Sequence, residues 1–140
     1  QILSVASGES KLAIANTYYY ALMLSGKKGK EQKEAAKKVR PFFPNQQNRG
    51  THMNISGIGV LKHSPNPSNA IKFIEFLLTH KAQEHMVNNT FEYPMIESVD
   101  PPFLITKMGS SFKQDNITNV SSYGKWQRDA FKIMQEAGWN

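Results

Sequence analysis

Residues 11–26 read KLAIANTYYYALMLSG and join two segments of different character. The first six residues form a short apolar run, which is typical of a buried strand. Asn16 or Thr17 can then cap a helix over 18–25, and Gly26 suits the left-handed position that follows a helix. The stretch therefore predicts a strand that leads directly into a helix, the unit from which α/β folds are built.

Helical and extended segments alternate on both sides of this stretch. The strongest helical pattern starts at Ala70 and keeps its apolar residues on one face, and a second short helix follows Thr79. The connections are longer than a simple doubly wound sheet needs, but the alternation predicts an α/β architecture. Further helices are predicted over 1–7, 30–39 and 126–137, an extended segment over 51–63, and an irregular proline-rich segment over 90–102.

Length and composition are those of a globular chain. The 140 residues suffice for one domain, and 39% hydrophobic with 20% charged residues is not a disordered composition. No apolar run approaches the roughly 18 residues that a membrane span needs. Cysteine is absent, which excludes disulfides, cysteine-bound zinc and a thiol nucleophile. The chain starts at Gln1 rather than Met, and residues 1–7 have the pattern of the end of a helix. We therefore interpret the whole chain as the C-terminal part of a longer protein.

The positive charge is concentrated in one segment. The formal net charge is +6, and residues 27–40 hold seven basic and two acidic residues. Glu34 and Lys38 form an i,i+4 pair of the kind found on solvated helices, so one exposed helix face explains the basic character. A nucleic-acid surface would interleave aromatic residues for stacking, and 27–40 has none, so no nucleic-acid partner is expected. A nucleic-acid or interaction module on this helix is the rival of a different class, and steep salt dependence of binding would support it.

Enzyme motifs are absent from the sequence. The run GKKGKE lacks the spacing of a phosphate-binding loop, and SGIGV has only two of the three glycines of a dinucleotide site. His80 and His85 are five residues apart rather than four, and neither HExxH nor GxSxG occurs. With no visible nucleophile–base pair or carboxylate pair, the sequence predicts a protein that is not an enzyme.

Tyr18, Tyr19 and Tyr20 are three of only five tyrosines in the chain. Successive helical residues point about 100° apart, so three adjacent phenols cannot all pack into one core. Free N–H groups and a partial positive charge at the helix start favour an ionised phenol, and a strongly charged cation favours it far more. Phenolate is a hard oxygen ligand that suits a hard, highly charged metal such as ferric iron. Chemistry alone leaves two readings open: a metal site, or the amphipathic start of a half-buried helix.

Several stretches resemble one protein family and occur in the family's order. They are SGESKLAIANTYYYALML, FFPNQQNRGTHMNISGIGVLKHSPN, AIKFIEFLLTHKAQEHM, FEYPMIESVDPP and EAGWN, and they span nearly the whole sequence. The chain resembles the C-terminal portion of the periplasmic ferric-iron-binding proteins of bacterial ABC transporters. These are class II solute-binding proteins, also called bacterial transferrins. The most specific part of the likeness is Asn-x-Tyr-Tyr followed by the FPNQ and GTHMNISG runs.

The resemblance implies which residues bind the metal. The family's paired tyrosine ligands fall on Tyr18 and Tyr19, and Tyr20 is an extra aromatic that leaves a one-residue ambiguity. In the branch that binds a synergistic anion, such as carbonate or phosphate, Asn16 would lie near that anion. Other branches complete the site with further tyrosines and no anion. The remaining iron ligands would lie N-terminal to this chain.

The resemblance also implies a periplasmic-binding-protein-like class II fold of two lobes with iron in the cleft. Residues 1–48 would belong to the second lobe, 49–99 would return to the first, and 100–140 would finish in the second. The lobes would close over ferric iron and deliver it to an inner-membrane ABC permease, with the basic face at 27–40 meeting the permease or another negative surface. The rival within this fold is a solute-binding protein for another small anionic or organic ligand, with the tyrosines as an aromatic wall.

Overall fold

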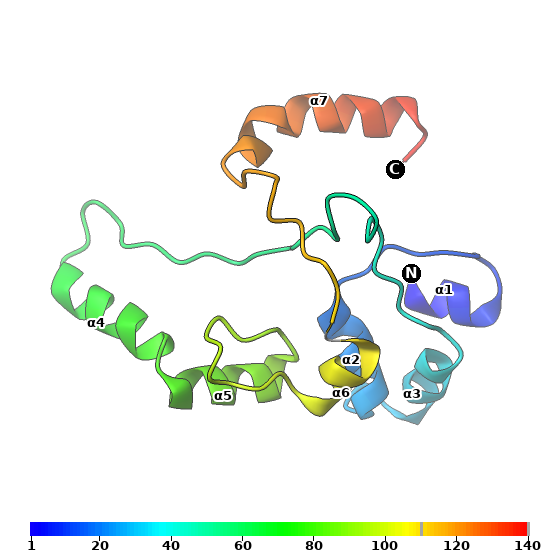
Figure 1. Cartoon of the computed structure of the whole chain (residues 1–140), viewed down its shortest axis with the longest axis horizontal. Coiled ribbons are helices and arrows are strands. Elements are labelled where there is room, and N and C mark those ends of the chain that lie inside the picture. The colour runs from blue at the N-terminus through cyan, green and yellow to red at the C-terminus, as the bar shows by residue number, and fades with distance from the viewer. Residues whose placement is uncertain (110, 140) are drawn as a thin grey trace. The chain divides into compact units, whose positions relative to one another are not determined.

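A computed structural model of the chain defines residues 1–109 and 111–139, and helices dominate this part of the chain (Figure 1). In the described residues the sheet-like pairing is a single parallel bridge between Thr51 and Gln114. The helices are α1 (Ile2–Ser7), α2 (Thr17–Ser25), α3 (Lys30–Lys37), α4 (Pro67–Leu77), α5 (His80–Thr90), α6 (Phe103–Gly109) and α7 (Ser122–Glu136).

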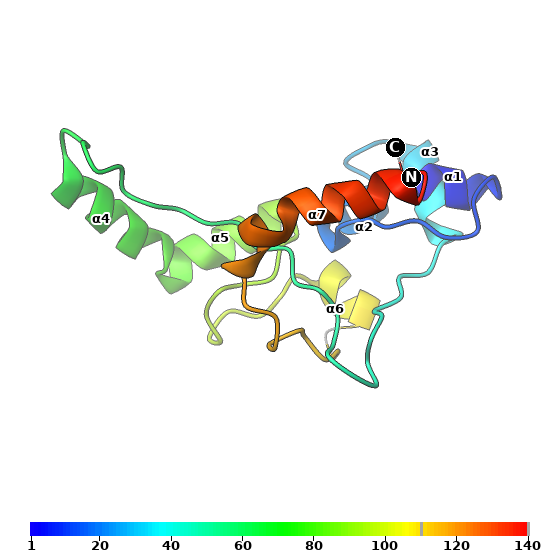
Figure 2. The same cartoon turned by 90° about the horizontal axis from the view of Figure 1, so that it is seen from above.

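The chain forms two compact units. Unit 1 comprises Gln1–Phe42 and Asn54–Ser111 and contains α1 to α6, whereas unit 2 comprises Phe43–Met53 and Phe112–Asn140 and contains α7. Within unit 1, α2 packs against both α3 and α6, α1 packs against α3, and α4 contacts α5. Both views show α4 and α5 as successive helices joined by a bend (Figure 1, Figure 2).

The α2 helix begins and ends where its sequence predicts. Asn16 occupies the N-cap position with an extended backbone, φ −72° and ψ 144°. Gly26 follows the helix in the left-handed region with φ 84°, and its N–H donates to the Met23 carbonyl at 3.1 Å. Glycine adopts this conformation without the steric cost that a Cβ would add. The cap residues therefore fix the position of the tyrosines in the first turn of the helix.

The core of unit 1 lies where α2 meets α6. Ala21, Phe91 and Ile105 form its buried cluster, and Ala21 and Ile105 are fully buried. A small residue such as Ala21 at the contact lets two helices approach closely. Tyr18 and Leu22 are partly buried and pack against the same cluster. Core packing therefore holds Tyr18 in place at the start of α2.

Two predicted elements form differently, and α6 was not predicted. The expected strand over 11–16 is irregular, and Leu12 and Ile14 expose 87% and 78% of their surface. A strand needs a neighbour to pair with its backbone N–H and C=O groups, and 11–16 takes part in no strand pairing among the described residues. The last helix begins at Ser122 rather than at Trp126.

The helical pattern after residue 66 divides into two helices, as predicted. Thr79 is the N-cap of α5, and its hydroxyl oxygen accepts a hydrogen bond from the Ala82 N–H at 3.4 Å. In the segment predicted to be extended over 51–63, residues 52–61 carry no regular secondary structure. The last part of this segment leads into α4 (Figure 1).

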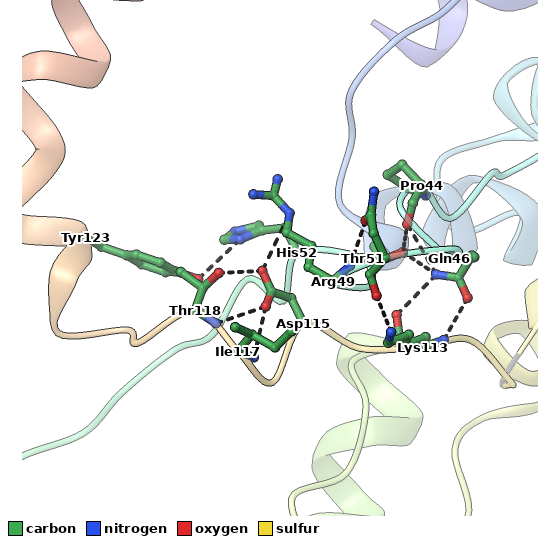
Figure 3. A network of polar contacts seen from close by, with 11 residues as sticks. Pro44, Gln46, Arg49, Thr51, His52, Lys113, Asp115, Ile117, Thr118 and Tyr123 are labelled. Carbon is green, nitrogen blue, oxygen red and sulfur yellow. Dashed lines mark hydrogen bonds and ion pairs between the residues drawn. The ribbon is translucent and has the colours of Figure 1, made fainter.

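Unit 2 is held together by polar contacts between 43–53 and 112–118 (Figure 3). The Gln46 side chain is central to them, because Nε2 donates to Thr51 Oγ1 at 2.9 Å and to the Lys113 carbonyl at 3.1 Å. Its Oε1 accepts from the Lys113 N–H at 2.7 Å. The Thr51 N–H donates to the Lys113 carbonyl at 2.8 Å, and the Thr51 carbonyl accepts from the Asp115 N–H at 2.9 Å. One amide side chain thus fastens two segments that are distant in sequence.

Asp115 anchors the turn that follows this contact. Its carboxylate accepts from the Ile117 N–H at 3.1 Å and from the Thr118 N–H and hydroxyl at 3.0 and 2.7 Å. The side chain is only 4% exposed, and Arg49 Nε lies 3.8 Å away. The hydrogen bonds from Thr118, followed by that from Ile117 and the charge of Arg49, hold the pKa of the Asp115 carboxyl below its usual range.

We expect Asp115→Asn to destabilise the protein at neutral pH but not in acid. A carboxyl group with a lowered folded-state pKa contributes stability above its unfolded pKa of about 3.9, and this contribution is lost as pH falls through the folded-state pKa. The free energies of unfolding of wild type and variant, measured with urea, should differ at pH 7 and converge toward about pH 2. Asp129→Asn, on the exposed surface of α7, is the matched control. A wild-type advantage that persisted unchanged in acid would contradict this role of the carboxylate.

Candidate functional site

Two of the three adjacent tyrosines meet in the first turn of α2. The ring centroids of Tyr18 and Tyr19 are 4.3 Å apart, and the ring planes are inclined by 51°. Tyr18 is half-buried against the core, whereas Tyr19 is 52% exposed. The pair therefore combines one phenol held by packing with one phenol that is open to a ligand.

The Tyr18 phenol also affects the ionisation of its neighbour. The Tyr18 side chain raises the pKa of Tyr19 above its usual value, first through hydrogen bonding and then through charge repulsion. Two adjacent negative oxygens repel each other, so the pair does not readily become doubly ionised by itself. A highly charged cation at the pair would remove this obstacle, because it stabilises both phenolates at once.

Asn16 contacts one member of this pair through its side chain. It occupies the N-cap position, but its side chain does not bond to the helix backbone. Instead, Asn16 Nδ2 donates to Tyr18 Oη at 3.0 Å. Its Oδ1 accepts from Nδ2 of Asn54 at 3.2 Å. Sequence reasoning missed Asn54, although this residue belongs to the GTHMNISG run that carried the family resemblance.

Tyr20 has a structural role rather than a place in the tyrosine pair. Its hydroxyl donates to the Val39 carbonyl at 2.8 Å, which connects α2 to the residues after α3. Burial raises the pKa of Tyr20 above its usual value. A phenol that is committed to a backbone carbonyl and disfavours ionisation is a poor metal ligand. The structure therefore separates Tyr20 from the pair formed by its two neighbours.

We expect Tyr20→Phe to lower the free energy of unfolding by about 0.5–1.5 kcal/mol, the usual net value of one hydrogen bond. The substitution leaves the Val39 carbonyl without this donor but keeps the aromatic ring. Urea unfolding of the full-length protein measures the loss. A Tyr20→Phe protein as stable as wild type would contradict this role of the hydroxyl.

A cluster of His, Cys, Asp and Glu side chains could also bind a metal ion. Within 1–109 and 111–139, no group of three or more His, Cys, Asp or Glu residues is placed to hold a metal ion. His52 Nδ1 lies 3.3 Å from Tyr123 Oη in unit 2, where the two rings are tilted at 43° (Figure 3).

Comparison with protein families assigns the chain to one of them. Residues 3–116 match the family of bacterial extracellular solute-binding proteins. The chain belongs to this family. Among curated members, iron uptake protein A1 of Synechocystis is 45% identical over 139 residues, which are 99% of this chain and 38% of the relative.

Solved structures of solute-binding proteins match the whole chain. FutA (IdiA) from Trichodesmium, solved in complex with iron and citrate, has a TM-score of 0.92 and 45% identity and aligns with 100% of this chain. The ferric binding protein from Campylobacter jejuni has a TM-score of 0.88 and 37% identity. In both cases the match covers 43% of the other chain, so this chain spans about two fifths of the length of its relatives.

These matches confirm the family and fold class expected from the sequence. The structural neighbours are ferric-binding solute-binding proteins, and this chain corresponds to part of their two-lobed class II fold. The assignment of 1–48, 49–99 and 100–140 to alternating lobes stays a prediction. No helix in the described parts of the chain is both long enough and apolar enough to cross a membrane.

Proposed function

We propose that Tyr18 and Tyr19 bind ferric iron as a pair of phenolates in an extracellular solute-binding protein. The observation that carries this proposal is the meeting of the two phenols at the start of α2, with ring centroids 4.3 Å apart. Two phenolates are hard, anionic oxygen ligands, and together they offset much of the ferric charge. Iron would in turn stabilise both phenolates against their mutual repulsion.

The relatives support iron as the cargo. Iron uptake protein A1 of Synechocystis and the ferric binding protein from Campylobacter jejuni carry iron in their names, and Trichodesmium FutA was solved with iron. Tyr18 and Tyr19 supply only two ligands, so further groups, from the rest of the protein or from an anion, complete the coordination.

Asn16 is proposed to lie beside an anion that binds together with iron. Its amide already contacts Tyr18, so an anion on iron at this position would come within reach of its N–H groups. Carbonate and phosphate fit this position because both offer hard oxygens to the metal and acceptors to the amide. The citrate bound with iron in Trichodesmium FutA supports the general idea of an oxygen-rich anion.

Transport is the proposed task of the whole protein. In this proposal two lobes close over ferric iron in the periplasm, and the cleft opens when an inner-membrane ABC permease receives the ion. Contacts made only in the closed state would hold the lobes together. The protein then binds and delivers its cargo without changing it chemically, so it is proposed not to be an enzyme.

A second candidate function is the binding of another small anionic or organic ligand. The exposure of the Tyr19 ring favours it, because an open aromatic face can stack on a ligand. Stacking tolerates replacement of tyrosine by phenylalanine, whereas metal ligation requires the phenol oxygen.

The experiment that tests the proposal is a visible absorption titration of the full-length protein with chelated ferric iron. Phenolate bound to ferric iron gives a charge-transfer band that phenol alone lacks. Growth of this band to saturation supports the iron site. A folded wild-type protein without the band would refute it and leave the second candidate in the lead.

A further inference from the structure

A chain of three side chains leads from the extended segment to the tyrosine pair. Asn54 Nδ2 donates to Asn16 Oδ1 at 3.2 Å, and Asn16 Nδ2 donates to Tyr18 Oη at 3.0 Å. Asn54 and Asn16 are 38 residues apart in the sequence. Unit 1 contains all three residues, so one compact body fixes their arrangement.

The donor and acceptor roles in these two hydrogen bonds cannot be exchanged. A phenolate only accepts hydrogen bonds, so an amide that supports it must present its NH₂ group rather than its oxygen. When Asn16 turns Nδ2 toward Tyr18, its Oδ1 points to the other side, where it can accept a hydrogen bond. Asn54 Nδ2 is the donor that the structure provides.

Without that donor, only the contact with Tyr18 favours one orientation of the Asn16 amide. The side chain makes no bond to the helix backbone that would hold it. A rotation by half a turn about its last side-chain bond would place Oδ1 beside Tyr18 Oη. Two acceptors would then face each other wherever Tyr18 is ionised, and this contact is repulsive.

We propose that Asn54 is a positioning residue for iron binding, which orients Asn16 so that its NH₂ group faces the Tyr18 oxygen. This inference rests on the proposed function of Tyr18 as a ligand. It gives a physical role to the GTHMNISG run, which contributes no proposed ligand of its own. Asn54 acts through Asn16, to which its side chain donates a hydrogen bond.

The test is a double-mutant cycle in the full-length protein with chelated ferric iron as the probe. The four proteins are wild type, Asn54→Leu, Asn16→Leu and the double variant, and the readouts are iron affinity and the position of the charge-transfer band. Asn54→Leu should weaken iron binding by about two- to tenfold, the effect of one hydrogen bond, and should move the band. In the Asn16→Leu background the same substitution should have no effect, because Asn54 acts only through Asn16.

A matched control and a metal-free measurement complete the design. Asn69→Leu makes the same change at an exposed position in α4 and should leave both readouts unchanged. In iron-free protein, Asn54→Leu should shift the side-chain amide resonances of Asn16. An unmoved band, or an equal loss in both backgrounds, would overturn the positioning role. A wild type without the band would instead refute the iron site and with it any positioning toward iron, and the Asn16 resonances would still show whether the amide contact exists.

Discussion

The Tyr18→Phe/Tyr19→Phe protein is expected to lose the ferric charge-transfer band and to bind iron more than about 10³-fold more weakly. Residues that only orient a metal ligand already cost about 10- to 100-fold in affinity when they are mutated, so the loss of two direct ligands should cost more. Phenylalanine keeps the aromatic ring and removes only the oxygen. The packing of Tyr18 on the Ala21, Phe91 and Ile105 cluster is therefore preserved. Absorption titration gives both readouts in one experiment.

Tyr20→Phe is the matched control for this result. It removes a phenol oxygen from the same run of three, but that oxygen donates to the Val39 carbonyl instead of meeting the pair. The control should keep the band at the wild-type position and intensity. A double variant that retained the band, or a control that lost it, would contradict the assignment of Tyr18 and Tyr19 as ligands.

Gly50→Ala is expected to destabilise unit 2 by about 2–5 kcal/mol, because left-handed strain and overpacking act together. Gly50 has φ 97°, a conformation that residues with a Cβ rarely adopt. A Cβ there would lie 2.6 Å from the backbone carbonyl carbon and oxygen of Gln114 and 2.7 Å from the Lys113 carbonyl oxygen. Those atoms belong to the backbone segment that pairs with Thr51, so moving them aside would disturb the pairing.

Urea unfolding and amide hydrogen exchange measure this effect in the full-length protein. The Thr51 N–H, which donates to the Lys113 carbonyl, should exchange faster in Gly50→Ala. Gly8→Ala is the control: its φ is 83°, but an added Cβ would meet nothing within 4 Å. It should cost only the left-handed strain of about 1–2 kcal/mol. Equal destabilisation by the two substitutions would show that close approach at Gly50 is unimportant.

Local features of the fold could be predicted from the sequence. The left-handed Gly26 and the break at Thr79 were predicted correctly, and of the two cap candidates, Asn16 and Thr17, Asn16 occupies the N-cap position. Each depends on a few neighbouring residues, whose conformational preferences act whatever the rest of the chain does. The strand over 11–16 was predicted on the same basis and did not form, because a strand is stable only when another strand supplies its hydrogen-bond partners.

The candidate site also has features that the sequence predicts and features that depend on the tertiary structure. The sequence by itself determined the family, the run of three tyrosines at a helix start and the candidate ligands, because these follow from residue identity and order. Only the tertiary structure decided that Tyr18 and Tyr19 meet while Tyr20 binds the Val39 carbonyl, and that Asn54 reaches Asn16. The physical reason is distance along the sequence. Val39 lies 19 residues from Tyr20 and Asn54 lies 38 residues from Asn16, so only the tertiary fold brings each pair together.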